Sequence, residues 1–198
     1  PDDVLDCVRS GTTMRLIAGL LAGQSFYSVL SGAEQLRRRP MDRVTQPLRQ
    51  MNAQIIGRDG GRLPPLSIIG SNLDGLDYAP PMASAQVKSC VLLAGLYAEG
   101  ETVVREPGPS RDHTERMLRA RGVQVETKGL VHRVQGPVDD LSPLDVSVPA
   151  DFSSAAYLIA AALLTPESDL TVRNVGVNPT RTGLLDVLQQ MGAQIEML

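Results

Sequence analysis

The amino-acid sequence predicts an α/β protein built from repeated βαβαββ units, with the helices buried and the sheets outside. Three observations predict this class. A segment recurs every 70 residues, each copy contains a strongly apolar helix, and a short β-rich run follows each of these helices. A repeat of this kind determines the architecture, because each copy is expected to form the same supersecondary unit.

The first apolar segment of each copy is expected to be a helix that follows an opening of small and hydroxyl-bearing residues. These helices are apolar nearly all round, so we expect them to be buried inside a domain. The expected ranges are 14–21, 91–96 and 157–164. A strand is expected after each helix, because the next residues have strand composition. The expected strands are 26–30, 101–104 and 169–172.

The second helix of each copy is expected to be amphipathic and to follow a turn that contains Pro and Arg. Ser110 and Thr180 are its N-cap candidates in the second and third copies. The helix should end at the equivalent positions Asn52, Gly122 and Gly192, where a left-handed C-cap suits Gly and is tolerated by Asn. Further strands are expected at residues 66–70, 123–126 and 131–136.

A domain boundary is expected in the polar, Pro-containing segment 138–145, which divides the chain into residues 1–145 and 146–198. The net charge of −3 and the 3% aromatic content argue against nucleic-acid binding. The longest apolar run, 155–164, has about half of the roughly 20 residues that a membrane span needs. No basic n-region opens the chain, and Cys7 and Cys90 are expected to be buried free thiols. These features predict a cytoplasmic protein without membrane or nucleic-acid partners.

The arginine-rich segment 36–43 is the first candidate for chemistry. Arg39 precedes Pro40, so its side chain is expected at the start of the following helix. Guanidinium groups bind phosphate and carboxylate, and helix N-termini donate amide hydrogens to the same anions. A solvated basic face is the alternative interpretation.

The small-residue openings at residues 10–13 and 83–88 are the second candidate, because they allow an anion to approach a helix N-terminus closely. Ordinary N-capping is the alternative, but three such openings in register with the arginine turns favour an anion-binding surface. Asp151 either caps a helix or contacts a ligand. His113 is interpreted as a surface or capping residue, and His132 is assigned no role. No metal cluster or cofactor-binding fingerprint is found, so no metal or cofactor is expected.

Five motifs occur in order along the chain, at residues 10–16, 38–41, 83–89, 110–115 and 178–183. Together they resemble the bacterial 3-phosphoshikimate 1-carboxyvinyltransferase (EPSP synthase) family over essentially the whole chain. The resemblance implies an inverse α/β barrel-like enolpyruvyl transferase fold with two domains of three βαβαββ units each. Residues 1–145 would form most of the N-terminal domain, and residues 146–198 the opening part of the C-terminal domain.

The resemblance also implies an activity and a set of contacts. The family transfers the enolpyruvyl group of phosphoenolpyruvate to the 5-hydroxyl of shikimate 3-phosphate in the shikimate pathway, without a cofactor. By motif, Ser84, Ala85, Gln86, Ser110 and Arg111 would bind shikimate 3-phosphate. Phosphoenolpyruvate would be bound by Gly11, Arg39 and Gln86. Thr12 and Asp151 are weaker candidates for the site, assigned to neither substrate.

The sequence departs from the family pattern at Val8, Arg9, Ala33, Asn52 and Ala150. Val8 and Arg9 replace a Gly-Asn pair beside the first small-residue opening, where bulk can distort the loop or fill the pocket. The general base and other catalytic segments of the family would lie outside this chain, so we expect it not to turn over by itself. A non-catalytic folded domain with an altered anion-binding pocket is the alternative.

Overall fold

The computed structural model describes residues 1–197, which form two compact units, residues 1–143 (unit 1) and 144–198 (unit 2). Part of the expected linker belongs to unit 1. Val138 and Leu141 pack against its core, and the Val138 amide donates to the carbonyl of Leu96 (2.8 Å). Residues 142–149 are exposed. The first half of segment 138–145 is therefore packed chain, and only the second half connects the units.

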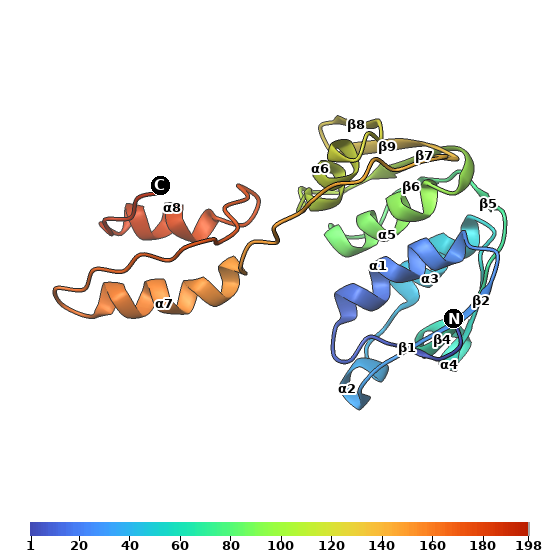
Figure 1. The fold of residues 1–198 in the computed structure, drawn as a ribbon, viewed down its shortest axis with the longest axis horizontal. Coiled ribbons are helices and arrows are strands. Elements are labelled where there is room, and N and C mark those ends of the chain that lie inside the picture. The colour runs from blue at the N-terminus through green and yellow to red at the C-terminus, as the bar shows by residue number, and fades with distance from the viewer. Residues whose placement is uncertain (198) are drawn as a thin grey trace. The chain divides into compact units, whose positions relative to one another are not determined.

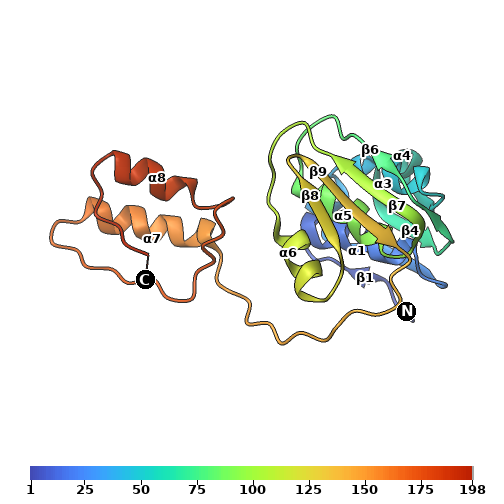
Figure 2. The same cartoon turned by 90° about the horizontal axis from the view of Figure 1, so that it is seen from above.

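Unit 1 contains two successive copies of the predicted βαβαββ repeat (Figures 1 and 2). The first copy comprises β1 (Leu5–Asp6), α1 (Gly11–Ala22), β2 (Tyr27–Ser31), α2 (Glu34–Arg37), α3 (Asp42–Gln50), β3 (Gln54–Gly57), α4 (Arg58–Gly61) and β4 (Leu63–Ile69). The second comprises β5 (Leu73–Asp74), β6 (Asp77–Tyr78), α5 (Ala85–Gly95), β7 (Ala98–Arg105), α6 (His113–Ala120), β8 (Val125–Lys128) and β9 (Val131–Gly136).

The two sheets of unit 1 have the same topology. Their strand orders are β1-β2-β4-β3 and β5-β7-β9-β8, and β6 also pairs with β7. In each sheet the first pair is parallel and the next two pairs are antiparallel. Val104 of β7 pairs with His132 of β9, and both side chains are buried. The α/β repeat predicted from the 70-residue spacing is thus confirmed in unit 1.

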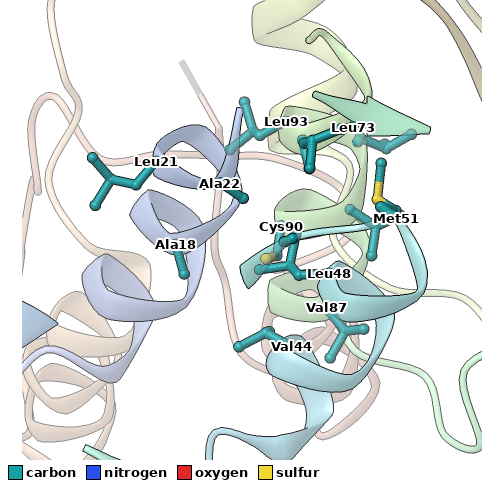
Figure 3. Packing of buried hydrophobic residues seen from close by; sticks show 14 of the residues in the cluster. Ala18, Leu21, Ala22, Val44, Leu48, Met51, Leu73, Val87, Cys90 and Leu93 are labelled. Atoms are coloured by element: carbon teal, nitrogen blue, oxygen red, sulfur yellow. The ribbon is translucent and has the colours of Figure 1, made fainter. Parts of the chain in front are cut away.

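The core of unit 1 forms where α1, α3 and α5 meet (Figure 3). Buried side chains such as Ala18, Leu48 and Leu93 converge there from the three helices. Gly19 allows α1 to approach α5 closely, because a Cβ at this position would lie 2.2 Å from the carbonyl oxygen of Cys90. Cys7 and Cys90 are free and buried as expected, and burial raises the pKa of Cys90 to about 12. The predicted burial of the first two apolar helices is confirmed.

The helix ends confirm one prediction and correct another. Asn52, Gly122 and Gly192 have φ values of 72°, 85° and 93°, so all three repeat positions adopt the left-handed C-cap. The expected N-caps were wrong. Asp112 precedes α6, and Thr182 precedes α8 (Gly183–Gln190), so both helices begin later than Ser110 and Thr180 imply.

The physical reason is local hydrogen bonding before each helix. Thr180 donates from its amide and hydroxyl to the Oδ1 of Asn178 (2.8 and 2.7 Å), which forms a turn in place of a helical start. The Ser110 hydroxyl is buried and turns toward Glu106, whose pKa it helps to lower. Each residue therefore stabilises the preceding loop.

Unit 2 contains α7 (Phe152–Leu164) and α8, with a single parallel bridge between Ala150 and Val175. Two expectations fail here. Residues 169–172 do not form a strand, and α7 is largely exposed, with Tyr157 and Leu164 81% and 84% accessible. The reason is that the described part of unit 2, residues 144–197, contains no sheet to pair with this segment or to cover the apolar helix. Within residues 1–197, no helix is long and apolar enough to cross a membrane.

Candidate functional site

The N-terminal ends of α1 and α5 lie together because the two helices pack in parallel. Thr12 contacts Gln86 at their first turns, and Gly19 contacts Cys90 further along. Ser10 and Ser84 cap the two helices by accepting from the amides of Thr13 (3.1 Å) and Val87 (3.5 Å). The positive ends of two helix dipoles are therefore adjacent, which favours an anion.

Gln86 joins the two repeats at this end. Its Nε2 donates to Thr12 Oγ1 (2.6 Å), and its Oε1 accepts from Arg15 Nη1 (2.7 Å). Arg15 Nη2 also donates to the carbonyl of Pro40 (2.9 Å), which anchors the turn that carries Arg39. Side chains 71 and 74 positions apart in the sequence thus form one hydrogen-bonded group.

Gly11 provides the space for the arginines of this group. A Cβ at Gly11 would lie 2.9 Å from Arg39 Nη1 and 3.2 Å from Arg15 Nη1. Burial lowers the pKa of Arg15, and the nearby charges of Arg39 and Arg43 lower it further. Three guanidinium groups in such proximity repel one another, and a bound anion would relieve that repulsion.

The second group of predicted residues lies on the same end of α5. Ser84 and Ala85 start the helix, and the loop 107–112, which carries Ser110 and Arg111, approaches it. A Cβ on Gly108 of this loop would lie 3.9 Å from Ala83 Cβ. Arg111 is exposed. Residues on α5 therefore belong to both groups, Gln86 to the first and Ser84 to the second.

The structure thus gathers Gly11, Thr12, Arg39 and Gln86, and places Ser110 and Arg111 in the loop that reaches the start of α5. Sequence reasoning missed Arg15, although its motif was noted. The available signal was a charged residue in an otherwise apolar helix: Arg15 is 8% exposed, and such a group needs partners.

Asp151 lies in unit 2 and caps α7. It accepts from the amide and hydroxyl of Ser154 (3.0 and 3.1 Å), and Arg181 is 3.5 Å away. The backbone of Ser153 and the Ser154 hydrogen bonds hold the pKa of Asp151 below its usual value. Of the two interpretations offered for Asp151, helix capping is the one that its hydrogen bonds support.

The remaining candidates are placed as follows. His113 is the exposed first residue of α6, whereas His132 is 5% exposed in β9 and contacts two carboxylates. Among residues 1–197, no group of three or more His, Cys, Asp or Glu side chains is arranged so that it could hold a metal ion. The site consists of cations, hydroxyls, an amide side chain and helix N-termini, a set that binds phosphate and carboxylate groups.

The residues that depart from the family pattern leave the first helix cap intact. Val8 adopts a left-handed φ of 51°, and the residue is 61% exposed. Arg9 is exposed as well. The Val8 carbonyl accepts from the amide of Ala33 (2.6 Å). Val8 therefore strains the backbone before Ser10 and points its side chain toward solvent.

Comparison with known proteins agrees with the motifs. The family model described as EPSP synthase (3-phosphoshikimate 1-carboxyvinyltransferase) matches residues 1–197. Enzymes of that name from Citrifermentans bemidjiense and Bacillus subtilis are 59% and 53% identical over 198 and 197 residues. The structure of EPSP synthase from Acinetobacter baumannii superposes with a TM-score of 0.88 at 50% identity and covers 98% of this chain.

The chain spans less than half of these relatives, 46% of each of the two enzymes and 44% of the solved chain. The matches nevertheless run through the whole of this chain, and the five motifs lie within them. The chain belongs to the EPSP synthase (3-phosphoshikimate 1-carboxyvinyltransferase) family.

Proposed function

We propose that this chain binds shikimate 3-phosphate and phosphoenolpyruvate, and that the whole protein to which these residues belong transfers the enolpyruvyl group from the second to the 5-hydroxyl of the first. The products are EPSP and phosphate, and the reaction belongs to aromatic amino-acid biosynthesis. The proposed location is the cytoplasm.

One observation carries the proposal: Gln86 links Thr12 and Arg15 where α1 and α5 present their N-termini beside Arg39. Both proposed substrates carry phosphate and carboxylate, so they repel each other unless cations surround them. Fixed guanidinium groups and helix N-termini at one place offset this repulsion without reorganising when the charges arrive.

The proposed roles follow the two groups of the site. Gly11 and Arg39 would contact phosphoenolpyruvate, with Thr12 as a weaker contact. Ser84, Ala85, Ser110 and Arg111 would hold shikimate 3-phosphate, and Gln86 would touch both ligands. Arg15 would position Gln86 through their 2.7 Å hydrogen bond. For Asp151 we propose only a secondary contribution in unit 2.

The 198-residue chain alone is proposed to bind substrate without turnover, since the relatives named above are more than twice its length. Phosphate release from the two substrates, measured with the chain alone, tests this part. Release at a rate of the order typical of enzymes, about 1 per second or more, would contradict it.

Isothermal titration of the chain with shikimate 3-phosphate tests the binding. We expect Arg111→Ala to weaken binding by about 10-fold or more, because a hydrogen bond to a charged group contributes about 1.5–3 kcal/mol. Ser84→Ala should also weaken it. Arg133→Ala is the matched control, since Arg133 pairs with Glu101 on the exposed side of the second sheet.

The alternative of a non-catalytic domain with an altered pocket gives a different result. In that case the chain does not bind, and Val8→Gly/Arg9→Asn restores binding. Equal binding by the chain and by its Arg111→Ala and Ser84→Ala variants would overturn the proposed contacts.

A further inference from the structure

Four ionisable side chains are buried together beneath the loop 107–112. They are Lys88 of α5, Glu106 directly after β7, Glu115 of α6 and His132 of β9, here called the tetrad. The side chains of Lys88, Glu106 and Glu115 are 1% exposed, and that of His132 is 6% exposed. None of the sequence motifs predicted this cluster, although Lys88 and Glu115 lie inside two of them.

Lys88 is the centre of the tetrad. Its Nζ lies 2.8 Å from Glu106 Oε2 and 2.8 Å from Glu115 Oε1. Glu106 immediately precedes the loop 107–112, and Glu115 follows it within the first turn of α6. One ammonium group therefore holds both ends of the loop.

A second basic side chain, His132, contacts the same two carboxylates. His132 Nε2 is 3.1 Å from Glu106 Oε2, and its Nδ1 is 3.3 Å from Glu115 Oε1 and from Thr127 Oγ1. Two carboxylates thus face one ammonium and one imidazole. Glu106 Oε1, both carboxylate oxygens of Glu115 and the nearby Ser110 Oγ are buried without a hydrogen-bond partner, so Lys88 contacts Glu115 as an ion pair only.

A buried charge cluster of this kind is poorly explained by stability alone. Removing charges from water costs several kcal/mol per ion, and apolar residues of similar volume are often equally stable in their place. In some proteins buried ion pairs instead specify the geometry between the elements that carry them. Here those elements are the two strands and two helices around the loop.

The tetrad connects this geometry to the candidate site. Lys88 lies one helical turn after Ser84, and its amide donates to the Ser84 carbonyl (3.0 Å). Next to it, Ser89 shares a 2.6 Å hydrogen bond with Thr114 of α6. The loop itself carries Ser110 and Arg111, and the proposed partners Ser84 and Gln86 lie at the start of α5.

We propose that Lys88, by holding Glu106 and Glu115 on either side of the loop, positions Ser110 and Arg111 for the phosphate of shikimate 3-phosphate, with His132 keeping the two carboxylates in place. The members of the tetrad are positioning residues that do not touch the ligand. The inference rests on the proposed function for the identity of the ligand, and on the geometry alone for the ordering of the loop.

The test compares Glu106→Gln with the control Glu101→Gln, which removes an exposed carboxylate from the same strand. Amide ¹⁵N relaxation of the ligand-free chain reports loop order. We expect order parameters near 0.85 for Ser110 and Arg111 in the unaltered chain and in Glu101→Gln, and values below about 0.6 in Glu106→Gln. Titration with shikimate 3-phosphate should give a Kd about 10-fold higher for Glu106→Gln and an unchanged Kd for the control.

A second variant keeps the test valid if Glu106→Gln does not fold. Lys88→Met/Glu106→Leu removes both partners of one ion pair, so neither charge of that pair is left buried alone, and Glu115 keeps His132 at 3.3 Å. It is expected to fold and to show the same loosened loop. A merely structural tetrad would lower the thermal midpoint of both variants while leaving loop order and Kd unchanged, and that result overturns the inference.

Failure of the proposed function can be distinguished from failure of the inference about the tetrad. If the unaltered chain does not bind shikimate 3-phosphate, the proposed function fails, and the relaxation data still decide whether the tetrad orders the loop. If the unaltered chain binds and Glu106→Gln binds equally well with an ordered loop, the proposed function stands and the inference fails.

Discussion

Val8 has a φ of 51°, a conformation that costs a residue with a side chain roughly 1–2 kcal/mol, and branching at Cβ adds to the strain. We expect Val8→Gly to stabilise unit 1 by about 1 kcal/mol, after the entropy that glycine loses on folding is subtracted. Urea unfolding measures the change. Val4→Gly is the matched control, since Val4 is also exposed and does not have a positive φ, and it should not stabilise.

The prediction for Gly11 concerns the binding of phosphoenolpyruvate and not the stability of unit 1. A methyl group here would lie 2.9 Å from Nη1 of the exposed Arg39 side chain, whose flexible end can move aside at little cost. Gly11→Ala should therefore change the unfolding free energy by less than about 0.5 kcal/mol. It should weaken phosphoenolpyruvate binding about 10-fold, as measured by titration. Unchanged affinity would show that Arg39 is not held for the ligand.

Glu106 makes unit 1 sensitive to acid. Burial raises its pKa, but the hydrogen bonds from His132 and Lys88 and the charge of Lys88 outweigh this effect and lower the pKa to about 2, from an ordinary value of 4.5. A carboxylate with a lowered pKa in the folded state contributes stability that is fully present above pH 4.5 and is lost as the pH falls toward 2. Urea unfolding at pH 5.5, 4 and 3 should show the decline.

Glu106→Gln serves as the reference for that measurement, because an amide does not titrate. Its unfolding free energy should depend less on pH over the same range, while the exposed carboxylates Asp77 and Glu126 contribute equally to both proteins. Parallel curves for the two proteins would contradict the assignment.

Predictions for single residues are confirmed where few residue types can adopt the backbone conformation that the position requires. Asn52 and Gly122 were predicted at helix ends because few residues tolerate a left-handed conformation, and they adopt it. The role of Arg15 and the tetrad were missed because their partners are distant in sequence. Lys88 and His132 contact the same carboxylate, Glu106, only after β9 pairs with β7. Whether the gathered residues bind the proposed substrates stays a prediction.

At the scale of elements, the packing of α1 on α5 depends on Gly19. In an exposed helix, Gly→Ala stabilises by about 1 kcal/mol, but here the methyl group would lie 2.2 Å from the Cys90 carbonyl, which belongs to the backbone and cannot rotate away. We expect Gly19→Ala to destabilise unit 1 by roughly 1–3 kcal/mol, the cost of overpacking. The urea midpoint measures it. Gly183→Ala, at a helical glycine with no atom within 4 Å of its Cβ position, should cost nothing.

Predicted strands are confirmed where the same repeat also contains the neighbouring strands with which they pair. Residues 131–136 form β9 as predicted, because β7 and β8 lie on either side of that strand. Residues 169–172 have equally good strand composition and form no strand. Composition describes what a segment favours, whereas a strand also needs a neighbour to accept its hydrogen bonds.

At the scale of the whole molecule, the two units should separate under a protease that cleaves before aspartate. Asp145 lies in the exposed stretch 142–149 that joins them. We expect limited digestion to cut there first and to release a fragment close to residues 1–144. This fragment should keep the amide spectrum of unit 1, because its core and both sheets are complete within it. First cleavage inside the core, for example before Asp74, would contradict the division.

The parallel arrangement of α1 and α5 has a consequence for how binding and unfolding are related. One helix comes from each copy of the repeat, and an anion at their adjacent ends would contact both copies at once. Pulling the two copies apart would then require the anion to leave. The affinity for that anion would therefore report how strongly the two structurally equivalent copies hold together, and at a saturating concentration of the anion they should unfold in a single transition.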